Sequence, residues 1–163
     1  MNPATATTSL NQVPALHKFV AELGMSVFDF GAGKKGKIDA FYQNRPRPHV
    51  YVAYDPFNRT REENVRAWRY LEDYGTDIVT CANVLNVLSD GDLAQACWDL
   101  RSATKHTTKE TVFVSVYHNR SLPPMVQRNG YVQRNQPITE YIPFLKMEFS
   151  TVAKAGNFLM CKI

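Results

Sequence analysis

The sequence predicts an α/β fold: a doubly wound, mostly parallel β-sheet with helices on both faces and a C-terminal antiparallel hairpin. Three observations predict it. Short apolar runs alternate with segments whose apolar residues recur at helical spacing. The first apolar run is followed by a glycine-rich stretch, 31–36, which suits a tight turn from strand to helix. Near the C-terminus two short runs flank Lys154-Ala-Gly-Asn157, which is typical of a hairpin.

The N-terminal half begins with a polar segment without periodicity, so we expect a flexible arm over 1–13. Pro14 suits the start of a helix and Gly24 suits its end. Apolar spacing and strand-forming runs then predict the following elements: helix 14–23, strand 25–30, helix 37–44, strand 49–54 and helix 61–74.

The C-terminal half continues the alternation, with Ser89-Asp90 as a predicted N-cap. The predicted elements are strand 77–82, helix 93–103, strand 111–117, a short helix within 138–145, and strands 147–153 and 158–163. Residues 118–137 are polar and contain Pro123-Pro124, so we expect a long functional or mobile loop. Trp68 and Trp98 lie at helical apolar spacing and are expected in the core.

Composition points to one ordinary globular domain over 14–163. The chain has 163 residues, of which 44% are hydrophobic and 21% charged. No apolar run reaches 18 residues, so no membrane span is expected. Three cysteines without a CxxC pattern argue against a disulfide framework and a zinc site, and no metal site is predicted. The N-terminus lacks the pattern of a signal peptide, which favours a cytoplasmic location.

Charge is distributed unevenly along the chain. Residues 1–100 contain 10 Lys and Arg against 12 Asp and Glu, whereas residues 101–163 contain 9 against 3. A basic C-terminal third can contact nucleic acid or another anionic partner, or it can be a solvated face that aids solubility. Both interpretations stay open. The oligomeric state stays open too, and an oligomer is possible.

The most informative residues are the glycine stretch Gly31-Ala-Gly33-Lys-Lys-Gly36 and Asp55, which ends the second predicted strand. Glycines after a first strand let a ligand approach the backbone N–H groups. An acid at the end of the next strand can accept hydrogen bonds from both hydroxyls of a ribose. The spacing from Gly36 to Asp55 is near the roughly 20 residues expected for this pair. The pattern predicts a nucleoside ligand; a structural turn and a capping Asp are the alternative.

The glycine pattern alone would suggest NAD, but Asp29 precedes Gly31 by two residues, where a carboxylate would oppose a pyrophosphate. The chain is also short for a separate catalytic domain and has no Tyr-x-x-x-Lys pair. An acid there suits a ligand with cationic groups. S-adenosylmethionine carries an ammonium and a sulfonium and no phosphate.

Three motifs resemble those of the class I S-adenosylmethionine-dependent methyltransferases, whose fold is Rossmann-like. Val27-Phe-Asp29-Phe-Gly31-Ala-Gly33 resembles their first motif, Tyr54-Asp55-Pro56-Phe57 their second, and the stretch 77–88 their fourth. The resemblance covers most of residues 15–163. It is closest to short methyltransferase-like proteins of phage and of DNA-modification neighbourhoods, whose substrate is generally not assigned.

The resemblance implies S-adenosylmethionine as the cofactor and assigns roles to individual residues. Asp29 would anchor the ammonium, Asp55 the ribose, and Asn83 would lie beside the reacting methyl group. The full set implied for cofactor binding is Asp29, Gly31, Ala32, Gly33, Gly36, Asp55, Pro56, Phe57 and Asn83.

The sequence departs from the family at two places. Lys35 stands where the third glycine is usual, and we expect Lys34, Lys35 and Lys37 to point to solvent. Only 21 residues separate Asp55 from Asp77, so the usual third strand is expected to be missing. In the family the loop after that strand reads the adenine amino group. Adenine recognition is therefore unplaced, with Phe57 as a candidate stacking surface.

Few protein groups are needed for methyl transfer beyond alignment of the reactants and exclusion of water. The candidate catalytic residues are Asn83, Asn86 and His118, although His118 can equally be a loop histidine bonded to backbone. The candidate substrate-binding residues are Tyr117, Arg128, Tyr131 and Arg134. The Asn83-Val-Leu-Asn86 stretch is not the (Asp/Asn)-Pro-Pro-aromatic motif of base-amino methylases, which weakens that reading.

The sequence thus predicts an S-adenosylmethionine-dependent methyltransferase whose acceptor, a small molecule or a nucleic acid, is unknown. A non-catalytic or cofactor-consuming S-adenosylmethionine-binding protein is the first alternative. An NAD-binding oxidoreductase-type domain is the second.

Overall fold

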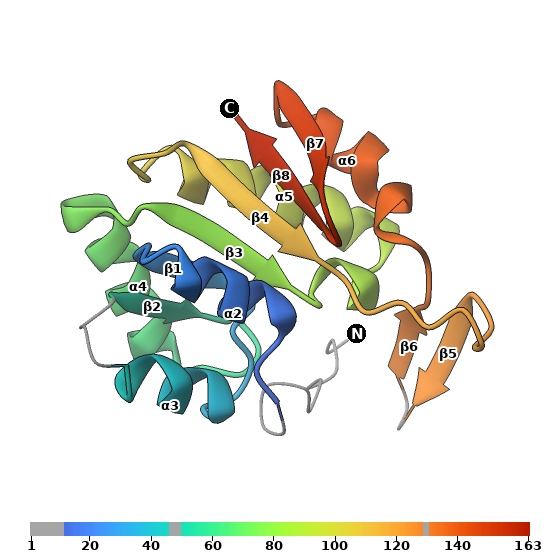
Figure 1. Cartoon of the computed structure of the whole chain (residues 1–163), viewed down its shortest axis with the longest axis horizontal. Helices are drawn as coiled ribbons and strands as arrows, with labels where there is room; N and C mark the ends of the chain where they lie inside the picture. The colour runs from blue at the N-terminus through green and yellow to red at the C-terminus, as the bar shows by residue number, and fades with distance from the viewer. Residues whose placement is uncertain (1–11, 46–49, 129–130) are drawn as a thin grey trace.

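A six-stranded sheet forms the centre of the computed structural model, which describes residues 12–45, 50–128 and 131–163 (Figure 1). The strand order is β2-β1-β3-β4-β8-β7. The four parallel strands are β2 (Tyr51–Tyr54), β1 (Val27–Phe30), β3 (Ile78–Ala82) and β4 (Thr111–Ser115). β8 (Phe158–Lys162) is antiparallel to both β4 and β7 (Thr151–Ala155). The predicted fold class, a Rossmann-like sheet with a C-terminal antiparallel hairpin, is confirmed.

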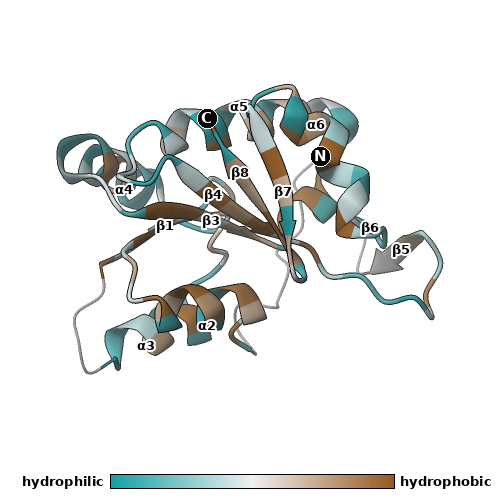
Figure 2. Cartoon of the chain, turned by 45° about the horizontal axis from the view of Figure 1, so that its top comes forward, coloured by the Kyte–Doolittle hydropathy of each residue, from teal (hydrophilic) through white to brown (hydrophobic). Residues whose placement is uncertain are grey.

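Helices cover both faces of the sheet (Figure 2). One face packs against α2 (Ala15–Glu22) and α3 (Lys37–Gln43). The other packs against α4 (Arg61–Tyr74), α5 (Asp90–Thr104) and α6 (Ile142–Lys146). Within the described residues, no helix has both the length and the apolar character that a membrane crossing requires.

The two longest helices begin at side-chain caps. The Thr60 hydroxyl accepts a hydrogen bond from the Glu63 N–H, and the Glu63 carboxylate accepts one from the Thr60 N–H. The Ser89 hydroxyl accepts from the Asp92 N–H, so Ser89 is the N-cap of α5, which begins three residues earlier than the sequence indicated. Such caps satisfy N–H groups that the first helical turn leaves without partners.

The short span between β2 and β3 contains a single element. Residues 55–77 are all described, and α4 is the one helix or strand among them. β2 is therefore the edge of the sheet, and the usual third strand is missing, as predicted.

The expectation of one long loop over 118–137 was wrong. This segment contains an antiparallel hairpin of β5 (Met125–Arg128) and β6 (Tyr131–Arg134). The Asn135 side-chain amide donates to the carbonyl oxygens of Asn119, Leu122 and Pro123 and ties down the segment before β5. β6 packs against the 3-10 turn η1 (Leu85–Val87) that follows β3. The sequence signal was Asn129-Gly130, a dipeptide typical of two-residue hairpin turns.

Smaller differences concern boundaries and one core residue. The predicted helix within 138–145 is a 3-10 turn, η2 (Ile138–Tyr141), followed by α6, and β7 begins four residues later than expected. Trp98 is 54% exposed, so its placement in the core was wrong. Its neighbours Cys97 and Leu100 take the core-facing side of α5, which turns the Trp98 ring outward. Most of the expected arm over 1–13, and the first residue of the expected strand 49–54, lie outside the described residues.

Asp77 joins the turns that precede β1 and β3. Its Oδ2 atom accepts hydrogen bonds from the Ser26 N–H and hydroxyl, both at 2.8 Å, and its Oδ1 atom accepts from the Thr108 hydroxyl at 3.0 Å. Partial burial opposes ionisation, but the hydrogen bonds from Ser26 and Thr108 outweigh it and lower the pKa of Asp77 below its ordinary value of 3.8.

We therefore expect Asp77→Asn to be less stable than the wild type at neutral pH, by about 1 kcal/mol for the lost hydrogen bonding. Because the folded-state pKa is the lower one, the carboxylate stabilises the fold above its unfolded pKa and loses this effect as the pH falls. The difference should narrow below pH 3.8. Urea unfolding of both proteins across acidic pH measures it, and a difference independent of pH would contradict the assignment.

Candidate functional site

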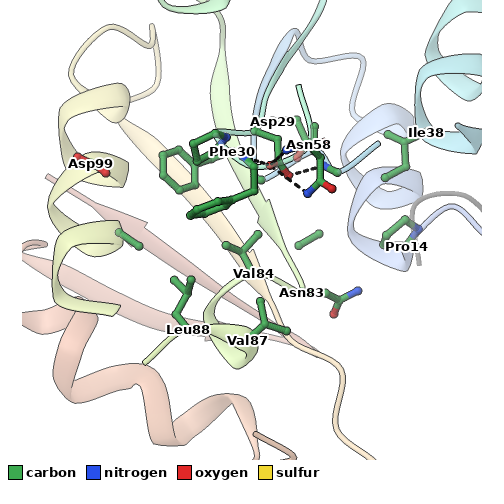
Figure 3. A pocket seen from close by; sticks show the side chains of 18 of the residues that line it. Pro14, Asp29, Phe30, Ile38, Asn58, Asn83, Val84, Val87, Leu88 and Asp99 are labelled. Atoms are coloured by element: carbon green, nitrogen blue, oxygen red, sulfur yellow. Dashed lines mark hydrogen bonds between the residues drawn. The ribbon is translucent and has the colours of Figure 1, made fainter. Parts of the chain in front are cut away.

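The candidate site is a cavity at the carboxyl ends of β1 and β3. From β1 the chain passes to β2 on one side and then returns to β3 on the other, so the turns after β1 and β3 diverge and leave a crevice. Figure 3 shows side chains from both turns and from α5 around this space. The residues that line it are Pro14, His17, Asp29–Gly33, Ile38, Asp55–Asn58, Ala82–Val84, Val87, Leu88, Asp92, Gln95, Ala96 and Asp99.

The glycine turn after β1 lies directly against the turn after β3. Gly31 has φ +80°, and a Cβ atom there would be 2.2 Å from Cγ2 of Val84. The N–H groups of Gly31 and Ala32 both donate to the Tyr54 carbonyl oxygen, at 2.8 and 3.0 Å. Only glycine combines this backbone conformation with this approach, which explains the residue at this position.

Asp55 holds the rest of the turn through its carboxylate, which is 5% exposed. Oδ2 accepts from the Gly33 N–H at 2.8 Å, and Oδ1 accepts from the N–H groups of Phe57 and Asn58 and from the Asn58 side-chain amide. A carboxylate offers about four acceptor positions, so these donors nearly saturate it. The Asn58 Oδ1 atom is buried in the described structure without a hydrogen-bond partner.

A second clamp holds the glycine turn from outside the cavity. The Arg59 guanidinium donates to the Gly33 carbonyl oxygen at 2.8 Å and to both Asp39 carboxylate oxygens at 3.0 Å. Asp39 in turn accepts from the N–H of Gly36, the N-cap residue of α3. Gly36 therefore shapes the helix start and does not line the cavity.

The three lysines of the turn do not line the cavity either. Lys34, Lys35 and Lys37 have exposed side chains, and the Lys35 ammonium pairs with Glu63. The contact with Lys35 has the largest effect on the pKa of Glu63 and the hydrogen bond from the Thr60 N–H the second largest. Together they lower this pKa to about 2. No phosphate-binding role for these lysines follows from their positions.

Asp29 lines the cavity from within a network of hydroxyl groups and is 1% exposed. Its Oδ2 accepts from the Tyr51 hydroxyl and its Oδ1 from the Thr80 hydroxyl, both at 2.8 Å. Burial, and to a smaller extent the charge of Asp29, raises the pKa of Tyr51 well above its ordinary value. The phenol therefore stays protonated and donates.

His17 of α2 completes this end of the cavity and is fully buried. Its Nδ1 atom is 3.2 Å from the Tyr42 hydroxyl. Its Nε2 atom is 3.5 Å from Asp29 Oδ1 but has no hydrogen-bond partner in the described structure. Sequence reasoning missed His17, because nothing local links a helix residue at 17 to the strand end at 29.

The opposite end of the cavity is formed by one face of α5, which was also missed. Asp92, Gln95, Ala96 and Asp99 line it, at the spacing that brings helical residues onto one face. The Gln95 amide donates to Asp99 Oδ1 at 3.0 Å. The available sequence signal was this polar stripe beside the apolar stripe of Leu93, Cys97 and Leu100.

The charge of the cavity is one-sided. Four carboxylates line it, from Asp29, Asp55, Asp92 and Asp99, whereas no lysine or arginine is found among the described residues that line it. The cavity therefore favours a ligand with positive charge and disfavours one with phosphates.

Most residues predicted to bind the cofactor lie along this one cavity: Asp29, Gly31, Ala32, Gly33, Asp55, Pro56, Phe57 and Asn83. Asn83 has φ +60°, which asparagine tolerates better than most residues, and its N–H donates to the Ser115 carbonyl oxygen. Its side chain lies at the edge of the cavity after β3 (Figure 3).

The other candidates do not line the cavity. Asn86 is fully buried, and neither polar atom of its side chain has a partner in the described structure. Tyr117 and His118 follow β4 outside the cavity, and Arg134 donates to Asp90 Oδ1 at 2.7 Å. Arg128 and Tyr131 belong to the hairpin by their backbone, and their side chains are not among those that the structure describes. The substrate-binding roles of Arg128 and Tyr131 stay predictions.

No group of three or more His, Cys, Asp or Glu residues that could hold a metal ion occurs in the described parts of the chain.

Comparison with known proteins supports the fold. No family model matches the chain and no curated protein is similar to it in sequence. A solved 1,6-didemethyltoxoflavin-N1-methyltransferase of Burkholderia thailandensis, with bound 1,6-didemethyltoxoflavin and S-adenosylhomocysteine, superposes with a TM-score of 0.57 at 14% identity, over 90% of this chain and 75% of that one. The chain thus shares the Rossmann-like fold of that methyltransferase.

Two further solved structures match less well, each at 14% identity over 90% of this chain. The DhpI–SAH complex has a TM-score of 0.48 with 79% of its chain covered, and PigF with SAH has a TM-score of 0.46 with 55% covered.

We expect Gly31→Ala to lower the free energy of unfolding by more than about 2 kcal/mol, because the new methyl group overlaps Val84 and strains the backbone. Denaturant unfolding measures the change. Gly91→Ala is the matched control: a Cβ at Gly91 of α5 meets nothing within 4 Å, so a change below about 1 kcal/mol is expected. Equal effects of the two substitutions would contradict the close approach at Gly31.

Proposed function

We propose that the chain binds S-adenosylmethionine in this cavity and transfers its methyl group to an acceptor. The charge of the cavity carries this proposal, because four carboxylates and no described lysine or arginine line it. S-adenosylmethionine has a positive sulfonium and an ammonium, which this charge attracts. The pyrophosphate of NAD would meet carboxylates instead, so the oxidoreductase alternative is disfavoured.

The cavity wall also contains buried polar atoms that have no hydrogen-bond partner among the described residues. His17 Nε2 and Asn58 Oδ1 are both buried without one in the described structure. A buried polar atom without a hydrogen bond costs about 1–3 kcal/mol. A ligand with polar groups at both places would recover this energy, which fits the amino-acid part and the ribose of S-adenosylmethionine.

The arrangement suggests how this cofactor would be held. Asp29 at the α2 end would face the ammonium, directly or through water, and the backbone of Gly31–Gly33 would follow the methionine part. The ribose would lie at Asp55. Because Asp55 is nearly saturated, the ribose hydroxyls would displace the Asn58 amide from Oδ1, and Asn58 Oδ1 could accept one of them.

When bound, S-adenosylmethionine supplies a methyl group that is electrophilic because it is attached to a positively charged sulfur. The contribution of the chain is to orient the reactants and to exclude water. Of the three candidate catalytic residues, Asn83 lines the cavity and would position the acceptor, whereas Asn86 and His118 do not line it. A general base is required only if the acceptor must lose a proton.

The acceptor side would be bounded by the β5–β6 hairpin, which packs against η1, and η1 begins two residues after Asn83. Tyr117, Arg128, Tyr131 and Arg134 belong to or flank this segment and stay the candidate substrate-binding residues. We propose that the acceptor is a small molecule or a nucleic acid. We also propose that the protein resembles short phage methyltransferases and acts in the cytoplasm. An oligomer or a partner chain that completes the acceptor site is a further proposal.

The first test is ligand selectivity, measured as a shift in melting temperature. S-adenosylmethionine and S-adenosylhomocysteine should stabilise the protein, by about 2.7 kcal/mol or roughly 5–10 °C at 100 times Kd, and NAD should not. A shift with NAD alone would show that the methyltransferase proposal is wrong. Stabilisation by duplex DNA without any cofactor effect would instead favour a nucleic-acid-binding module.

The product formed from S-adenosylmethionine separates the remaining alternatives. Methyl transfer leaves S-adenosylhomocysteine and a methylated acceptor. Cleavage of the bond between the sulfur and the γ-carbon of the methionine part leaves 5′-methylthioadenosine and the four-carbon amino-acid fragment. A non-catalytic binder leaves the cofactor intact. Chromatography after incubation with candidate small molecules or DNA distinguishes the three.

The second test concerns Asp29. Asp29→Asn should weaken the binding of S-adenosylhomocysteine about tenfold, as expected for one lost charge-assisted hydrogen bond. Binding of 5′-methylthioadenosine should be unchanged, because that molecule has no ammonium. Calorimetric titration of both ligands gives the result. An equal loss for both would place Asp29 elsewhere along the ligand.

A further inference from the structure

The end of the cavity at α5 is a slot with mainly apolar walls. Figure 3 shows the Phe30 ring on one side and Val84 and Leu88 on the other, with α5 closing the end at Asp99. Phe30 and Leu88 are buried, whereas Phe57, which also lines the cavity, is 52% exposed. A planar heterocycle fits between aromatic and aliphatic walls of this kind.

The polar groups at the end of the slot come from α5. Asp99 is half-buried, and the hydrogen bond found for its carboxylate in the described structure is the one that Oδ1 accepts from Gln95. The Oδ2 atom can therefore accept another. Gln95 lies one helical turn before Asp99 and restricts its orientation. The slot thus ends in an oriented hydrogen-bond acceptor with a negative charge.

We propose that Asp99, oriented by Gln95, accepts a hydrogen bond from the exocyclic amino group of the adenine and so selects a 6-aminopurine. This inference rests on the proposed function, because it assumes a nucleoside ligand in the cavity. The amino-acid end of that ligand belongs at Asp29 and the ribose at Asp55, which leaves the base in the apolar slot.

The missing third strand is the structural reason for this arrangement. Only α4 lies between β2 and β3, so no loop from a further strand stands beside Asp55 and Phe57. α5 forms the wall of the slot, and its polar stripe is the source of hydrogen-bonding groups there.

A 6-oxopurine tests the assignment by its chemistry. Its carbonyl oxygen would face the Asp99 carboxylate, so two acceptors would meet without a proton between them. A site built around a hydrogen bond rejects an analogue that cannot make it, because its polar group is left unpaired. The wild type should therefore bind S-adenosylhomocysteine at least about tenfold more tightly than S-inosylhomocysteine, which differs only at positions 1 and 6 of the purine.

The experiment is calorimetric titration of both ligands with three proteins: the wild type, Asp99→Asn and Asp73→Asn. An Asn amide can donate to an oxo group or accept from an amino group, so Asp99→Asn should reduce the preference to about threefold or less. Asp73 is exposed on α4 and does not line the cavity, so Asp73→Asn should keep the wild-type preference.

Three results would overturn the proposal, and they are distinguishable. If the wild type binds both ligands equally, the protein does not read the amino group. If Asp99→Asn retains the full preference, another residue reads it. In both cases the proposed function stands. If the wild type binds neither ligand, the proposed function fails and this inference fails with it.

Discussion

The close approach of Gly31 to Val84 is the constraint on which the site depends. It places the turn after β1 against the turn after β3, so that two strands far apart in the sequence share one cavity at their carboxyl ends. A side chain at position 31 would separate the two turns. Asp55 and Arg59 then hold the turn from its other side, through Gly33 N–H and Gly33 carbonyl oxygen. The cavity is thus built mainly from backbone held by side chains.

Two carboxylates of the site, those of Asp29 and Asp55, accept hydrogen bonds from neutral donors. Asp29 accepts from two hydroxyl groups, and Asp55 accepts from three backbone N–H groups and an amide. Neutral donors stabilise a buried carboxylate without neutralising it, whereas an arginine or lysine would cancel its charge. The cavity therefore combines stable burial with a negative potential, which is the property that a cationic ligand requires.

The short connection between β2 and β3 affects the side of the cavity that α5 forms. α4 crosses directly to β3, and β2 is left as the sheet edge. α5 then serves two purposes: Leu93, Cys97 and Leu100 pack into the core, while Asp92, Gln95 and Asp99 face the cavity. The β5–β6 hairpin packs on η1, which follows Asn83, and none of its residues is among the described residues that line the cavity. The wall at α5 thus comes from a segment without a motif of its own.

The sequence by itself determined the strands of the sheet, the glycine turn after the first strand, the position of Asp55 at the end of the second strand, and the missing strand. These signals are local: apolar periodicity, a φ angle that only glycine adopts readily, and the length of the chain between Asp55 and Asp77. Even the β5–β6 hairpin had a local signal in Asn129-Gly130.

Only the tertiary structure decided that His17, Asn58 and the polar stripe of α5 belong to the site, that Trp98 is exposed, and that Asn86 and His118 lie outside the cavity. The physical reason is that a helix face acquires its role from the element packed against it. The rotation of α5 about its axis, and hence which of its two stripes meets the strand ends, is set by packing of the whole sheet.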